Sequence, residues 1–278
     1  MELGMNIRNW GPTATREFLL TASQYADQSA LDALWFNDHV GFPPVLENNP
    51  YGIPLEMSEI IDPLGFGCYL AAATSRIKFG TGVLVIPYRS ALLTNKWLTA
   101  IQVLSDNRFL LGIGPGYMDE EFKALGVPKT RRGKITDETL AFLRETSKNP
   151  VTEVNGQAIK LEPALPCPPI YIGGNKKVAF PRAVKYGDGW MPVGDSPEDL
   201  IAPVKELQQM AADAGRGALE VVEMKTLPLE DRSQSIELIQ AYKEAGVTHF
   251  VHTQAYETTA QHAEVVDQVA GEIRDAVN

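Results

Sequence analysis

Cysteine is scarce in this chain: Cys68 and Cys167 are the only two among 278 residues, and they stand far apart. They show no CxxC spacing and have no histidine beside them. Small domains that rely on disulfides carry more cysteines, and structural metal sites need closely spaced ligands. The pair therefore predicts two isolated thiols rather than a disulfide or a metal site.

Histidine is also rare, with four copies in the chain. His249, His252 and His262 follow no HExxH or carboxylate-triad spacing, so we predict no metal site. A GxSxG nucleophile elbow is missing as well. These absences argue against metalloenzymes and against hydrolases that work through a nucleophilic serine.

Basic residues are outnumbered, with 25 Lys and Arg against 35 Asp and Glu, for a net charge of −10. The one dense basic stretch, "KTRRGK" at 129–134, is interpreted as a solvated helix entry, so we expect no nucleic-acid partner. No apolar run approaches the roughly 18 residues that span a bilayer, and "MELGMNIRNWGP" at the start has no basic and apolar leader. We expect a cytoplasmic protein with no membrane partner.

Short apolar runs alternate with amphipathic ones along the whole chain, which is typical of repeated βα units. An amphipathic helix is predicted over 14–30, and another runs from the cap Ser196 to Gly215. Eight such units favour a single (β/α)8 TIM barrel spanning 1–278, with an open doubly wound sheet as the alternative. The predicted strands are 2–6, 33–37, 77–85, 109–113, 169–173, 189–193, 220–226 and 248–252.

Three segments interrupt the alternation. Residues 38–61 and 114–132 are long loops after the second and fourth strands, and 150–168 has the pattern of a hairpin before the fifth. Loops that follow strands lie on the C-terminal face of a barrel, where active sites form. The first two loops are therefore predicted to be insertions that border a site on that face.

Glycines mark two strand ends. "IGGN" at 172–175 closes a strand and opens a helix, where bare main-chain amides suit an anion such as a phosphate. "GIGPG" at 112–116 likewise removes side chains where a ligand approaches, although it is not the GxGxxG fingerprint of nicotinamide cofactors. Together they favour a flat, phosphorylated cofactor across the barrel mouth. Simple packing of tight turns remains the alternative for both.

Two further positions suggest chemistry. Asp38 and His39 come directly after the second strand, where a histidine can exchange a proton with a substrate hydroxyl and a carboxylate can set its tautomer. The alternative is a capping aspartate beside an exposed histidine. In "IKFGTGVLVIPYRS" at 77–90, glycines interrupt a strand, which indicates either a bulge pressed against a planar ring or a barrel corner.

Four segments taken in order resemble the luciferase-like monooxygenase superfamily: "NDH" at 37–39 and the long stretches 62–127, 131–144 and 168–190. The likeness is dense to residue 193 and weak beyond it. It is strongest to the branch of coenzyme F420-dependent oxidoreductases. The resemblance implies a TIM barrel that binds F420, a deazaflavin, or else FMN at the C-terminal mouth, and that forms a homodimer.

Site residues follow from the same resemblance. It implies a cis peptide at Gly82–Val83 behind the ring, general base chemistry at His39 with Asp38 orienting it, and Tyr117 as a proton donor or pocket residue. Relatives that oxidise a phosphorylated sugar have Glu at the position of Tyr117, so that substrate is not expected. The implied cofactor contacts are Asp38, His39, Thr81, Gly82, Val83, Gly114, Pro115, Gly116, Ile172, Gly173, Gly174 and Asn175.

The function expected from the residues and the resemblance is hydride transfer between F420 and a small organic substrate. A monooxygenase that uses reduced FMN and O2 is the first alternative, and a flavin-binding barrel without turnover is the second.

Overall fold

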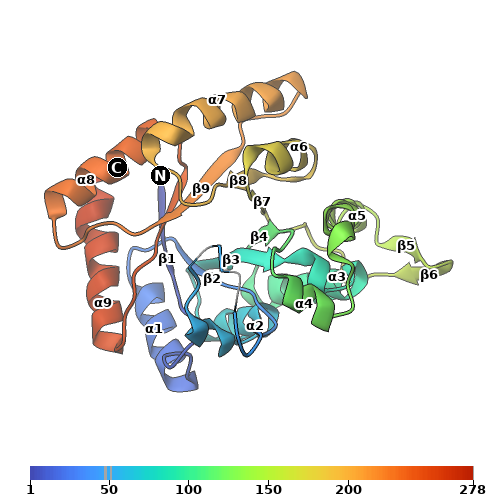
Figure 1. Ribbon diagram of the computed structural model, residues 1–278, viewed down its shortest axis with the longest axis horizontal. Helices are drawn as coiled ribbons and strands as arrows, with labels where there is room; N and C mark the ends of the chain where they lie inside the picture. Colours follow the sequence, from blue (N-terminus) through green and yellow to red (C-terminus); the bar gives the residue numbers. More distant parts are fainter. Residues whose placement is uncertain (47–48, 51, 278) are drawn as a thin grey trace.

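The computed structural model describes residues 1–46, 49–50 and 52–277, and within them eight parallel strands close into a barrel (Figure 1). The order around the barrel is β1-β10-β9-β8-β7-β4-β3-β2, which confirms the TIM barrel and rules out the open sheet. The strands are β1 (Glu2–Asn6), β2 (Ala33–Phe36), β3 (Lys78–Val85), β4 (Phe109–Gly114), β7 (Ile170–Gly173), β8 (Gly189–Met191), β9 (Glu220–Lys225) and β10 (His249–His252). All eight predicted strands are confirmed, with ends that differ by at most two residues.

Helices surround this barrel and are often capped by the residues that the sequence marks. Thr15 accepts a hydrogen bond from the amide of Phe18 at the start of α1, and Ser196 does the same for Asp199 at α7. The helices are α1 (Arg16–Gln28), α2 (Pro63–Ala73), α3 (Ala91–Ser105), α4 (Asp119–Ala124), α5 (Arg132–Thr146), α6 (Lys176–Tyr186), α7 (Pro197–Asp213), α8 (Arg232–Glu244), α9 (Thr259–Gln268) and α10 (Arg274–Val277).

The three predicted interruptions are present. The segment 150–168 contains the antiparallel hairpin β5 (Val151–Val154) and β6 (Gln157–Lys160), which projects from the barrel at the right of Figure 1. The loop 114–132 carries the short helix α4 and a 3-10 turn at Lys129–Arg131 that leads into α5, so the basic stretch is a helix entry. The loop 38–61 contains a 3-10 turn at Leu55–Ser58, and part of it falls on 47, 48 and 51, outside the described residues.

Apolar side chains fill the inside of the barrel, so it is a packed core and not a pore. The outer core lies between strands and helices and contains residues such as Phe36, Phe79 and Phe180. Because the inside is full, a ligand has to lie on a rim. The inner cluster consists of Ala33, Trp35, Leu110, Tyr171, Met191, Val222 and Val251, with Val83 and Met224 against it.

Both cysteines are free thiols. Within the described residues, no group of three or more His, Cys, Asp or Glu side chains is arranged to hold a metal ion. None of the described helices combines the length and the apolar character that crossing a membrane requires.

Candidate active site at the barrel mouth

An irregularity in β3 shapes the C-terminal mouth. The peptide bond between Gly82 and Val83 is cis, as the resemblance implied. The pairing of β3 with β4 shifts register between Thr81 and Leu84, which fits the bulge, the first of the two alternatives for the glycines of this strand. Thr81 is buried, and its hydroxyl donates to the carbonyl of Gly112 at 2.7 Å. Its side chain therefore ties the two strands together and is not free to contact a ligand.

Val83 explains why one position on each of the neighbouring strands β4 and β7 is a glycine. A Cβ built at Gly114 would lie 2.7 Å from one methyl group of Val83, and a Cβ at Gly173 would lie 3.1 Å from the other. The Cβ at Gly173 would also lie 2.9 Å from the carbonyl oxygen of Ile113. These two glycines therefore have a packing role, since they let the bulged strand press inward. The mouth gains an apolar floor formed by Val83.

Asn37 holds the carbonyl group of Gly82, which is part of the cis peptide beneath this floor. Its amide nitrogen donates to the oxygen of Gly82 at 3.1 Å, and its amide oxygen accepts from Asn6 and from the indole of Trp10, each at 3.2 Å. The backbone amide of Asn37 donates in turn to Asn9 at 3.0 Å. A side chain bonded on both ends of its amide group is fixed in orientation, so the cis peptide has a defined position in the mouth.

Asp38 has a different partner from the one we predicted. It was expected to orient His39, but its carboxylate forms a two-pronged ion pair with Arg89 at 2.7 and 2.9 Å and accepts from the amide of Val85. Arg89 also reaches Asp62, the N-cap of α2, at 2.8 Å. Burial raises the pKa of Asp38, and the guanidinium of Arg89 opposes that shift. Asp38 therefore anchors the end of β2 rather than the imidazole.

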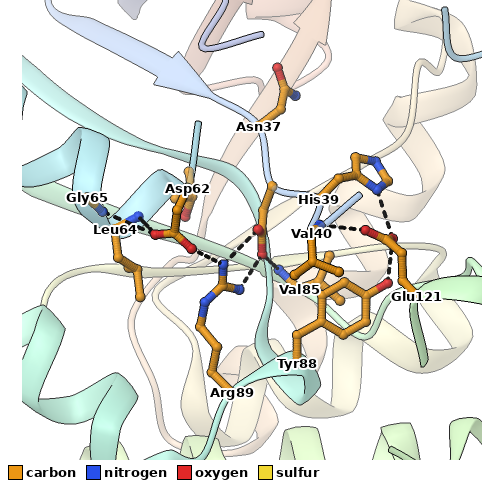
Figure 2. Close-up of polar contacts among 12 residues, drawn as sticks. Asn37, His39, Val40, Asp62, Leu64, Gly65, Val85, Tyr88, Arg89 and Glu121 are labelled. Atoms are coloured by element: carbon orange, nitrogen blue, oxygen red, sulfur yellow. Dashed lines mark hydrogen bonds and ion pairs between the residues drawn. The ribbon is translucent and has the colours of Figure 1, made fainter. Parts of the chain in front are cut away.

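The carboxylate that contacts His39 belongs to Glu121, which lies on α4. Its Oε2 lies 2.9 Å from Nδ1 of His39 and accepts from the hydroxyl of Tyr88 at 2.7 Å, while its Oε1 accepts from the amide of Val40 at 2.6 Å. Glu121 is 1% exposed and His39 7%. In Figure 2, Arg89 and Asp62 lie on one side of the end of β2, and His39, Tyr88 and Glu121 lie on the other.

These contacts define which nitrogen of the His39 imidazole carries a proton. Burial works to raise the pKa of Glu121, but the hydrogen bonds from His39, Tyr88 and Val40 outweigh it, so that pKa lies below its ordinary value. An ionised carboxylate only accepts hydrogen bonds, so Nδ1 of His39 must carry a proton. In the neutral ring, Nε2 is then a proton acceptor. The pair is arranged as a general base and its orienting group.

Aromatic rings border the imidazole. Phe42 packs edge to face with His39 at 4.9 Å between ring centroids, and Tyr117 does so at 6.1 Å. The structure therefore brings Tyr117 to His39, as expected of a residue that lines the pocket. Two rings against one imidazole limit the access of water to it.

Beyond β7, the start of α6 offers main-chain donors. Asn175 is its N-cap and makes no side-chain capping bond, so the first amides of the helix are left for another acceptor. Gly174 has a φ of +118°, and a Cβ there would meet nothing closer than 3.6 Å. Its own amide donates to Met191 at 3.2 Å and is already used. The free main-chain amides at the start of α6, which we call the anion cradle, therefore begin at Asn175 and not at the glycines of the predicted turn 172–175.

Other predicted contacts serve the framework. Ile172 is buried in the outer core, away from the mouth. Gly116 has a φ of +76°, and a Cβ there would lie 2.6 Å from Val85, so glycine is required by the turn itself. Pro115 is half-buried beside it. Pro115 and Gly116 therefore position the loop after β4, whereas Ile172 belongs to the core.

Four residues of the site were not predicted from the sequence, namely Glu121, Tyr88, Arg89 and Asn37. One signal was available for Asn37, because it stands inside "NDH" with the two residues that were chosen. Glu121 is the third of three consecutive acidic residues in α4 and is the buried one of the three. No local pattern separates it from its exposed neighbours.

Two curated relatives align with large parts of the chain. An uncharacterised protein of Mycobacterium tuberculosis is 33% identical over 164 residues, which are 56% of this chain and 57% of that protein. The 5,10-methylenetetrahydromethanopterin reductase of Methanolobus tindarius is 28% identical over 205 residues, which are 72% of this chain and 57% of the reductase. The chain covers little more than half the length of these relatives.

Solved structures with the same fold include proteins that use either cofactor. A coenzyme F420-dependent tetrahydromethanopterin reductase of Methanopyrus kandleri has a TM-score of 0.74 at 15% identity, with 100% of both chains covered. A type II Baeyer-Villiger monooxygenase of Pseudomonas putida, the oxygenating constituent of 3,6-diketocamphane monooxygenase solved with FMN, has a TM-score of 0.78 at 13% identity, with 98% of both chains covered. At these identities the two structures establish a shared fold.

The family itself follows from a match along almost the whole chain. The model of the luciferase-like monooxygenases aligns with residues 5–276, which include all of β2 to β10 and every residue of the mouth described above. This range also covers the part beyond residue 193, where the sequence likeness had been weak. The chain therefore belongs to the luciferase-like monooxygenase family.

Proposed function

We propose that this protein is an oxidoreductase that moves a hydride between coenzyme F420 and a small organic substrate. The observation that carries the proposal is the hydrogen bond from His39 to Glu121 at the mouth. When an alcohol carbon loses a hydride, its hydroxyl must also lose a proton, and the reverse reaction returns both. A buried imidazole with Nε2 as acceptor suits that proton.

The mouth fits a flat ring with an anionic tail. Val83 and the Gly82–Val83 peptide provide an apolar floor for the ring, and the uncapped start of α6 at Asn175 provides amides for a phosphate. When bound, the deazaflavin supplies the hydride chemistry, which no side chain of the chain can provide. The protein supplies the binding, the orientation and the proton transfer.

Each residue of the site then has a distinct task. Nε2 of His39 takes the proton from the substrate hydroxyl, or returns it in the opposite direction. Glu121 keeps Nδ1 protonated and fixes the plane of the ring. Phe42 and Tyr117 pack against the imidazole and exclude water, while Asp38 and Arg89 hold the backbone that carries His39.

Titration of the purified protein with F420 and with FMN, followed by fluorescence quenching, tests the cofactor. We expect F420 to bind at least about tenfold tighter than FMN, a difference of about 1.4 kcal/mol. The FMN-using monooxygenase with the same fold makes FMN the second candidate. Binding of FMN alone would establish that candidate instead, and cofactor binding without turnover of any alcohol or carbonyl compound would indicate a non-catalytic barrel.

The anion cradle has a sharper test. Asn175→Asp adds a negative charge at an N-cap, where aspartate is well tolerated by the helix but repels a phosphate. We expect the Kd of the phosphorylated cofactor to rise about tenfold. The matched control is Thr15→Asp at the N-cap of α1, which should leave that Kd unchanged. Equal affinities in both variants would remove the start of α6 from the cofactor site.

We also propose a homodimer formed through α3. Leu93, Trp97 and Leu104 lie at spacings that place them on one side of this helix and are 63%, 46% and 59% exposed. An apolar stripe of this kind is typical of an interaction surface. Light scattering should give twice the 30.5 kDa mass of one chain. Trp97→Glu should give a monomer, and a wild-type monomer at micromolar concentration would contradict the proposal.

A further inference from the structure

Arg8 is held at the mouth by two aromatic rings. Its guanidinium carbon lies 4.6 Å from the ring centroid of Trp10 and 5.8 Å from that of Tyr256. The backbone amide of Arg8 donates to the hydroxyl of Tyr256 at 2.8 Å. Arg8 follows β1 and Tyr256 follows β10, and these two strands are paired. The cation is therefore fixed on the rim where the two strands end.

Within the part of the chain that the structure describes, the guanidinium of Arg8 has no anionic partner. Among the described residues, none accepts a hydrogen bond from the side chain of Arg8 or forms an ion pair with it. The other half-buried arginines do have such partners: Arg89, Arg182 and Arg274, for example, each contact a carboxylate. Arg8 is half-buried as well, so two rings shield a charge that no carboxylate in the described ranges neutralises. The donors of its guanidinium remain available for a ligand.

A short chain of contacts links this cation to the floor of the mouth. The indole of Trp10 stacks with Arg8 and donates to Asn37, whose amide nitrogen donates to the carbonyl of Gly82. Arg8 therefore has a defined position relative to the Gly82–Val83 peptide. A ligand group bound by Arg8 would lie at the same mouth as the proposed ring site.

The cofactor's own tail is not the best candidate for this cation. The start of α6, which follows β7, is the proposed cradle for the tail. In the barrel order, β1 and β7 are separated by three strands in either direction, so they stand on opposite sides. A tail that binds at the start of α6 leaves the cation at β1 for a different anion.

We infer that Arg8 binds an anionic group of the substrate, most simply a carboxylate, so that the substrate is a small organic anion. This inference rests on the proposed oxidoreductase function. A guanidinium binds a carboxylate or a phosphate through two parallel hydrogen bonds, and stacking on Trp10 holds the planar group ready for that geometry. The substrate's reacting carbon is then oriented from its charged end.

Binding of simple probes to the cofactor-free protein tests the inference. Tryptophan emission is followed during titration with benzoate, phenyl phosphate and benzamide. We expect benzoate to bind the wild type about tenfold tighter than the neutral benzamide. In Arg8→Gln the affinity for benzoate should fall about tenfold and that for benzamide should not change. The affinity of Arg8→Lys for benzoate should lie between those of wild type and Arg8→Gln, because lysine keeps the charge but lacks the planar guanidinium.

Controls separate the anion site from general charge and from folding. Arg16→Gln removes an exposed arginine from the start of α1 and should leave all three affinities unchanged. Thermal unfolding of each variant verifies that it is folded. If phenyl phosphate binds through Arg8 and benzoate does not, the anion site stands and the substrate is a phosphate ester. Equal binding of benzoate, phenyl phosphate and benzamide to wild type, or equal binding of both anions to wild type and Arg8→Gln, would overturn the inference.

The two proposals fail in different ways. If neither F420 nor FMN binds, the oxidoreductase proposal fails, whereas the benzoate titration is made without cofactor and keeps its meaning. The Kd of F420 should be the same in wild type and Arg8→Gln. A Kd that rises in Arg8→Gln while benzoate binding stays constant would assign Arg8 to the cofactor's tail and overturn the substrate assignment.

Discussion

His39→Ala should lower turnover by about 10²- to 10⁴-fold while the Kd of the cofactor stays within about twofold. The expected loss is the usual contribution of a positioned general base. It arises because the substrate proton loses its acceptor, whereas the floor at Val83 and the start of α6 are untouched. Turnover is measured under single-turnover conditions, and the Kd by fluorescence quenching.

Chemical rescue distinguishes a loss of proton transfer from structural damage as the cause of the lower turnover of His39→Ala. Free imidazole should restore part of the activity of His39→Ala, because the ring it replaces is in a pocket bordered by Phe42 and Tyr117. Imidazole should not restore the activity of Glu121→Gln, because this variant still has the ring of His39. Parallel loss of turnover and cofactor affinity in His39→Ala, without rescue, would make His39 a binding residue.

Glu121→Gln is the matched test of orientation. The amide that replaces the carboxylate can donate to His39, which favours the tautomer with the proton on Nε2 and blocks the base. We expect a loss of turnover of at least about 10- to 100-fold, the range found for residues that orient a metal-bound histidine. Asp38→Asn should not reproduce this tautomer effect, because Asp38 contacts Arg89 and not the imidazole.

The barrel could be predicted because its signals are local and repeated. Each of the eight strands is a short apolar run, and each helix has a polar face and often a capping residue, as at Thr15 and Ser196. Glycines inside the third predicted strand indicated the bulge that appears between Thr81 and Leu84. These features depend on a few neighbouring residues and need no knowledge of distant contacts.

The site could be predicted only in part, because its decisive contacts join distant segments. Glu121 reaches His39 across 82 residues, and Arg89 reaches Asp38 across 51. The glycine pattern was ambiguous for a physical reason: Gly114 and Gly173 are small to admit Val83, while Gly174 adopts a positive φ at an open turn. A glycine that makes room for a neighbour and one that makes room for a ligand look the same in the sequence.

Glu223 predicts an unusual pH dependence of the stability of the fold. It lies on β9 with 0% exposure, and no described side chain pairs with either carboxylate oxygen. Burial, helped by the negative charge of Asp195, raises the pKa of Glu223 from 4.5 to about 8. The folded protein therefore keeps a proton that the unfolded chain releases near pH 4.5.

The sign of the effect follows from that difference. Below pH 4.5 the carboxyl group is protonated in both states, so it adds no pH dependence to the free energy of unfolding. Between pH 4.5 and about 8 only the unfolded chain ionises, so each pH unit lowers the free energy of unfolding by about 1.4 kcal/mol, and the total is on the order of 5 kcal/mol. Glu223 thus destabilises the fold as the pH rises, and the penalty is constant above pH 8.

Glu223→Gln removes this titration while keeping the size of the side chain. The variant should gain stability relative to wild type steadily from pH 5 to 8, as measured by urea unfolding, whatever constant offset the buried amide adds. Glu244→Gln on the exposed end of α8 is the control and should show no such trend. A difference between Glu223→Gln and wild type that is flat from pH 5 to 8 would mean that Glu223 ionises in the folded barrel as it does in the unfolded chain.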